Sequence, residues 1–204
     1  AFCLLMIAVS FAAPARAGAY DDMVQAMKQN DAAKVLHLLE LGMDVNTTDR
    51  AGNTLLMMAA RNGQDELLEF LLKNNASVLK KNKYGDTALM LAALEGRLKV
   101  VLPLIKAGSE INPKSGWFPL AYAAFNGHTD VLQTLLDNGA NVDTQSDNGN
   151  TALRIASRNG HVEIIKLLLA RKAATQLKNQ QGQTALQIAQ QAKNDEIARL
   201  LASE

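Results

Sequence analysis

The chain has 204 residues, of which 48% are apolar and 20% charged, so it is long enough and apolar enough to bury a core. This composition argues against a disordered chain. Its 21 Lys and Arg residues balance 20 Asp and Glu residues, so the total charge gives no reason to expect binding to nucleic acid or to an acidic membrane surface. We therefore expect a protein partner and no nucleic acid.

The first seventeen residues, AFCLLMIAVSFAAPARA, are typical of a secretory signal peptide. Apolar residues run from Phe2 to Ala13, and the triplet Ala15-Arg16-Ala17 supplies a small-x-small cleavage motif. An apolar run of about 12 residues is too short for a membrane-spanning helix, which needs about 20. We expect cleavage near Ala17, no membrane insertion afterwards, and a periplasmic or secreted location. Because the chain begins at Ala1 without Met or a basic segment, we also expect residues upstream.

Metal and disulfide chemistry is not expected in the mature chain. The single cysteine, Cys3, lies in the predicted signal peptide, so neither a disulfide nor a thiolate metal site would survive cleavage. A metal site or an acid–base pair would need two histidines close together, and nothing in the sequence places His37, His128 and His161 so, which is why we interpret them as structural or solvent-facing. We predict no metal ion and no cofactor.

Beyond the predicted signal peptide, five near-copies of one sequence each begin with glycine. They read GNTLLMMAARNG, GDTALMLAALEG, GWFPLAYAAFNG, GNTALRIASRNG and GQTALQIAQQAK, starting at Gly52, Gly85, Gly116, Gly149 and Gly182. The spacing is 33 residues, except for 31 between Gly85 and Gly116. An apolar segment with helical period, such as ELLEFLL or VEIIKLLL, follows each copy. This period predicts an array whose repeats bury their apolar faces against one another.

The residue types within a copy predict its local structure. The opening glycines suit positive φ at the tip of a turn, and the threonine two residues later can cap a helix, as at Thr54 and Thr87. Small pairs such as Ala59-Ala60 allow inner helices to approach closely. In the third copy Phe118 replaces the threonine, and we expect it to pack inward while Pro119 favours the first helical turn.

The period, order and residue types together resemble the ankyrin repeat over about residues 20 to 204. The resemblance implies an all-α repeat solenoid: an ankyrin array of about six helix-turn-helix units with β-hairpin fingers. The expected organisation is a signal peptide at 1–17 and a repeat domain at 18–204, with units at about 20–48, 49–81, 82–112, 113–145, 146–178 and 179–204. The first and last units diverge and are expected to act as caps.

The resemblance also implies a binding surface, because ankyrin arrays use their finger tips and inner-helix face, which line a concave groove. Aromatic, Met and Arg side chains are common binding hot spots. The predicted protein-binding residues are Met57, Tyr84, Met90, Leu94, Trp117, Phe125 and Arg158. Trp117 and Phe125 attract particular interest, because the third copy holds four of the chain's Trp, Tyr and Phe residues. The alternative is that these aromatics fill space left by the shortened interval, with Tyr122 in the core.

The function expected from these features is a non-enzymatic protein-interaction scaffold. Three short segments, SVLK, KSG and SDN, match parts of the serine β-lactamase signature, but the last two occur in reversed order and fall at turns. The chain looks like a bacterial periplasmic member of its family, a monomer that binds or protects another exported protein. The alternatives are a secreted effector that binds a host protein, or an enzyme with an unrecognised site.

Overall fold

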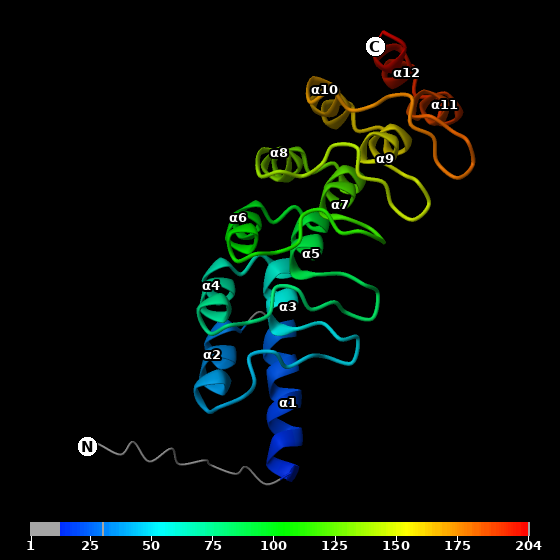
Figure 1. The fold of residues 1–204 in the computed structure, drawn as a ribbon. Helices are drawn as coiled ribbons and strands as arrows, with labels where there is room; N and C mark the ends of the chain where they lie inside the picture. The colour runs from blue at the N-terminus through cyan, green and yellow to red at the C-terminus, as the bar shows by residue number, and fades with distance from the viewer. Residues whose placement is uncertain (1–12, 30, 204) are drawn as a thin grey trace. The chain divides into compact units, whose positions relative to one another are not determined.

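The computed structural model describes residues 13–29 and 31–203, and these residues form twelve α-helices (Figure 1). Within them the only strand-like pairing is an isolated antiparallel bridge between Thr48 and Thr54. The predicted all-α repeat solenoid is therefore confirmed. The chain divides between Asp44 and Val45 into two compact units, which are described separately below.

The first unit is one helix pair, α1 (Ala13–Lys28) and α2 (Ala32–Glu40). Met23 and Met27 of α1 and Val35 of α2 are almost fully buried in it. Asp31 caps α2 by accepting a hydrogen bond from the backbone N of Lys34 at 3.0 Å. Residues 1–12 of the predicted signal peptide lie outside the described residues. Its last five residues, 13–17, form the beginning of α1.

The second unit contains five helix pairs, and each predicted repeat from 49 onward holds one of them (Figure 1). Inner helices pack against inner helices and outer helices against outer helices, in chain order. The inner helices are α3 (Leu55–Asn62), α5 (Ala88–Leu94), α7 (Pro119–Asn126), α9 (Ala152–Asn159) and α11 (Ala185–Gln191). The outer helices are α4 (Asp65–Lys73), α6 (Leu98–Lys106), α8 (Thr129–Asp137), α10 (Val162–Ala170) and α12 (Asp195–Ala202).

The helix caps follow the sequence pattern closely. Thr54, Thr87, Thr151 and Thr184 each accept a hydrogen bond from the backbone N three residues later, at 3.1 to 3.3 Å. Such a cap contributes about 1 kcal/mol. Phe118 makes no capping hydrogen bond and is 1% exposed, while Pro119 occupies the first turn of α7. The prediction that Phe118 packs inward is confirmed.

The fingers join each outer helix to the next inner helix, and they form tight turns without a strand ladder. In the first finger tip, Asp49–Asn53, the N of Asp49 donates to the O of Asn53 and the N of Gly52 to the O of Asp49, both at 2.9 Å. The tips Asn82–Asp86, Ser146–Asn150 and Asn179–Gln183 repeat both hydrogen bonds. The predicted β-hairpins are thus short hairpin turns, because each pairs only at its tip.

A second set of contacts ties each repeat to the one before it. His128 Nε2 lies 3.0 Å from the carbonyl oxygen of Leu94, and since a carbonyl only accepts, this nitrogen carries the hydrogen. His161 makes the same contact with the oxygen of Phe125. The structural interpretation of these histidines is confirmed. The His128 ring lies against Gly96, where a Cβ would come within 2.5 Å of Nδ1.

This packing predicts that Gly96→Ala destabilises the array more than Gly85→Ala. Both glycines have positive φ, 67° and 87°, so both variants place alanine in the left-handed region at about 1–2 kcal/mol. Only Gly96→Ala also drives a methyl group into the His128 ring, because nothing lies within 4 Å of a Cβ at Gly85. Urea denaturation followed by circular dichroism gives the two free energies of unfolding. Equal losses would show that the ring does not constrain Gly96.

Candidate protein-binding surface

Three aromatic rings of the third repeat pack together and form the aromatic cluster, Trp117, Tyr122 and Phe125. The Trp117 ring centroid lies 5.1 Å from that of Tyr122 and 5.8 Å from that of Phe125, the second pair edge to face. Trp117 is 39% exposed and Phe125 44% exposed, although they contact each other. The cluster therefore presents a preassembled apolar surface to solvent.

The third finger differs from the others in a way that frees Trp117 for this packing. Its tip begins with Pro113, which has no N–H and cannot make the hydrogen bond that closes the other tips. In the first two fingers the residue at the position of Trp117 is polar and bonded to the next repeat. Asn53 accepts from Asn82 Nδ2 at 2.9 Å, and Asp86 accepts from the Tyr122 hydroxyl. Trp117 instead packs on the inner helix of its own repeat.

Tyr122 connects the cluster to the second finger. Its hydroxyl donates to Asp86 Oδ1 at 2.5 Å, and the side chain is half-buried. Three causes raise the pKa of Tyr122 well above its ordinary value. Burial is the largest, followed by the hydrogen bond to Asp86 and the negative charge of that carboxylate. The ring thus contributes to packing, while its hydroxyl fixes the position of α7 against the second finger.

The structure separates the seven predicted binding residues into two groups. Tyr84 is 81% exposed, Trp117, Phe125 and Arg158 are also exposed, and Leu94 is half-buried. These five are accessible, and their role in binding stays a prediction.

Met57 and Met90 are buried, at 1% and 2% exposure, so the prediction that they lie on an accessible face is wrong. Each sulfur folds back and accepts a hydrogen bond at 3.4 Å from the backbone N of the capping threonine, Thr54 or Thr87. In the first helical turn, each methionine thus supplies an acceptor for the backbone N–H of the capping threonine.

Arg154 stands at the same helical position in α9 and is also buried, at 1% exposure. Its Nη1 donates to the carbonyl oxygens of Leu177 and Gln183 at 2.7 and 3.3 Å. Burial lowers the pKa of Arg154. Among the described residues its Nε and Nη2 have no acceptor. Met57, Met90 and Arg154 occupy the same position in their repeats, and all three side chains are buried.

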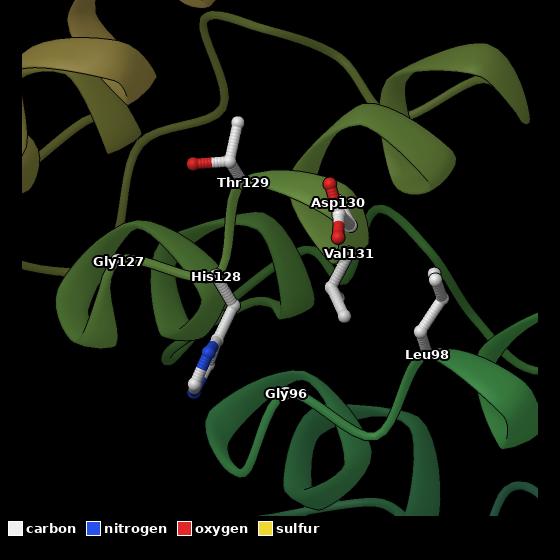
Figure 2. Close-up of a pocket in the computed structure, with 7 residues that line it drawn as sticks. All are labelled: Gly96, Leu98, Gly127, His128, Thr129, Asp130 and Val131. Carbon is white, nitrogen blue, oxygen red and sulfur yellow. The ribbon is translucent and has the colours of Figure 1, made fainter.

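A pocket of about 310 Å³ lies where the turn from α5 to α6 meets the turn from α7 to α8 (Figure 2). Its lining residues are Gly96, Leu98, Gly127, His128, Thr129, Asp130 and Val131. His128 already donates to Leu94 through Nε2, so this imidazole acts as a structural link.

The three segments that match parts of a catalytic signature are not brought together by the fold. The SVLK, KSG and SDN segments lie in three different fingers, and the hydroxyl of Ser146 accepts from the backbone N of Asn150 within its own turn. Across the part of the chain that the structure describes, no three His, Cys, Asp or Glu residues group as a metal site. In the same residues no helix has the length and apolar character needed to cross a membrane.

Comparisons with known proteins agree with the repeat architecture. A family model of ankyrin repeats in three copies matches residues 23–115 and 120–204. A putative ankyrin repeat protein of Rickettsia bellii is 26% identical over 132 residues, covering 60% of this chain and 38% of that protein.

Two further relatives are much longer than the matched part. Glycerophosphocholine phosphodiesterase GDE1 of Candida albicans is 36% identical over 104 residues, 48% of this chain and 9% of that protein. The nuclear factor NF-kappa-B p105 subunit of Gallus gallus is 31% identical over 137 residues, 64% of this chain and 14% of that protein. The chain thus spans less than half the length of each of these relatives.

The contact between Tyr122 and Asp86 predicts an unusual tyrosine titration. Because the folded pKa is raised, the contact stabilises the fold below the ordinary tyrosine pKa of about 10, and this contribution is lost as the pH rises through the folded pKa. Absorbance at 295 nm should show one of the three tyrosines ionising later than the others. Tyr122→Phe should remove that late phase. Simultaneous ionisation of all three, with helical circular dichroism intact, would contradict the assignment.

Proposed function

The chain belongs to the ankyrin-repeat family, and from this we propose that it is an exported, non-enzymatic scaffold that binds or protects another protein through its aromatic cluster. Ankyrin repeats indicate a protein-interaction scaffold. The phosphodiesterase relative matches over only 9% of its own length, so its name assigns no reaction to this chain.

The observation that carries the proposal is the exposure of Trp117 and Phe125 beside an inner helix, α7, whose residues Leu120, Ala121, Ala123 and Ala124 are buried. Phe118 and Leu120, in the same repeat, are each only 1% exposed, so the fold has a core available for apolar residues. A partner that covers the two exposed rings would gain about 2 kcal/mol for each. The rings already contact each other, so little side-chain entropy is lost when a partner binds.

Export is the second element of the proposal, and it rests on the apolar run and the Ala-Arg-Ala triplet of residues 1–17. The first fully buried residue after Ala17 is Met23. Removing residues 1–17 therefore leaves the buried contacts of α1 in place. We propose that the mature protein is a monomer in the periplasm or outside the cell.

Affinity capture from a periplasmic extract tests the binding role. Trp117→Ala with Phe125→Ala should reduce recovery of the partner at least about tenfold, because each truncation removes about 2 kcal/mol of apolar contact. A matched control is Leu98→Ala with Leu102→Ala, which removes two exposed apolar side chains from α6. The control should leave recovery unchanged in quantitative mass spectrometry. Equal recovery with all three proteins would contradict a binding role for the cluster.

Cell fractionation tests export. Expressed in a bacterial host, the protein should be released by osmotic shock, and its intact mass should correspond to a chain beginning at Gly18. The thermal midpoint of this processed form should equal that of the unprocessed chain, because Met23 and Met27 lie beyond the cleavage point. Full-length chain that stays with the membranes after carbonate washing would overturn the cleavage prediction.

A further inference from the structure

Basic side chains recur on the first three fingers of the second unit. This basic finger surface consists of Arg50, Lys80, Lys81, Lys83 and Lys114, all of them exposed. The ion pairs formed among the described residues involve other cations, namely Lys34, Arg61, Lys73, Lys99, Lys166 and Arg171. The finger cations are therefore free to pair with groups outside the chain.

Among the described residues, the carboxylates in the same finger tips form no ion pair with these cations. Asp49 accepts hydrogen bonds from the backbone N of Ala51 and from the backbone N and Nδ2 of Asn53, at 2.8, 2.8 and 2.9 Å. Asp86 accepts from the hydroxyl of Tyr122 and, at 3.4 Å, from Asn82 Nδ2. Both carboxylates are partly buried and serve their own turns. Within the tips 49–53, 82–86 and 113–117, the exposed charged residues are Arg50, Lys83 and Lys114, all of them positive.

Hydrogen bonds between neighbouring repeats make the basic finger surface continuous with the aromatic cluster. The backbone N of Lys83 donates to the O of Ala51 at 3.0 Å, which joins the tips of the first and second fingers. The hydroxyl of Tyr122 then joins the second finger to the cluster through Asp86. Tyr84, 81% exposed, lies beside Lys83 on the second tip.

We propose that this combined surface binds an acidic, extended polypeptide segment, whose apolar side chain rests on Trp117 and Phe125. This inference rests on the proposed function and specifies the chemistry of the partner. Single exposed ion pairs contribute about 0–1 kcal/mol, so the cations act together by attracting and orienting an acidic segment. The aromatic rings supply most of the affinity.

A protein segment suits this surface better than a nucleic acid. The whole chain has a formal net charge of only +1, and acidic residues such as Asp65, Glu66 and Glu69 on α4 would repel a long polyanion. A short acidic segment can reach the fingers without approaching the outer helices. The cluster also offers an apolar contact, which an acidic segment with a Leu or Phe side chain can use.

Fluorescence anisotropy with a short labelled peptide tests the proposal. The probe alternates Glu and Gly around a central Leu-Phe pair, and its control carries Gln in place of every Glu. The acidic peptide should bind at least about tenfold more tightly than the Gln peptide, and its affinity should fall as salt rises. Binding should also change the emission of Trp117, the only tryptophan.

Charge reversal locates the site. Lys81→Glu with Lys83→Glu should weaken binding at least about tenfold, because both side chains are exposed and unpaired. Lys99→Glu with Lys106→Glu on α6 makes the same change in total charge and should leave affinity within about twofold. The finger variant should keep the wild-type thermal midpoint, whereas the α6 variant, which breaks the exposed ion pair between Lys99 and Asp65, should lower it slightly. Equal binding of the Glu and Gln peptides, or equal weakening by both variants, would overturn the proposal.

Two further outcomes separate this inference from the proposed function. If a captured partner depends on Trp117 and Phe125 but is unaffected by Lys81→Glu with Lys83→Glu, the acidic-segment inference fails and the scaffold role stands. If a labelled single-stranded oligonucleotide or anionic lipid vesicles bind more tightly than the acidic peptide, and the charge reversal abolishes that binding, the surface recognises a different polyanion and the inference is overturned.

Discussion

The structure of the second unit depends on contacts between successive repeats, because a single helix pair exposes apolar faces that only a neighbour can cover. Small residues let the inner helices come close: Ala92 and Ala93 of α5 are fully buried. Polar links then fix the spacing, as His128 bonds to the carbonyl of Leu94 and lies against Gly96. Glycine at position 96 therefore has two causes, the positive φ after α5 and the room required by His128 of the next repeat.

The third repeat shows how such an array tolerates an irregular member. The shortened interval and Pro113 remove the hydrogen bond that closes the other finger tips. The missing threonine cap is compensated by a buried Phe118 and by Pro119 in the first helical turn. Phe118 fills the core and Tyr122 is half-buried, whereas Trp117 and Phe125 stay exposed, and the binding role of the two exposed rings stays a prediction. The irregular third repeat thus keeps a packed core around Phe118 and also exposes an apolar surface at Trp117 and Phe125.

Much of this fold could be predicted from sequence, since the repeating glycine, threonine and alanine positions each have a local physical cause. The failures have a common origin. Met57 and Met90 looked accessible from their place in the repeat, but both side chains fold back onto the cap. Repeat position indicates where a Cα lies and leaves open where a long, flexible side chain goes. For the same reason Arg154 reaches the carbonyl of Gln183 in the next repeat, which no pattern within its own repeat could indicate.

Total charge was also a poor guide to the surface, because charges of opposite sign occupy different elements. Acidic residues such as Asp65 and Glu66 begin outer helices, where the helix dipole favours them. The cations Lys81 and Lys83 lie on a finger whose own carboxylate, Asp86, is held by Tyr122 and Asn82. A nearly neutral chain can therefore present a locally positive face. The hydrogen bond that holds Asp86 thus has two effects: it anchors the aromatic cluster to the second finger, and it engages the carboxylate of the tip that carries Lys83.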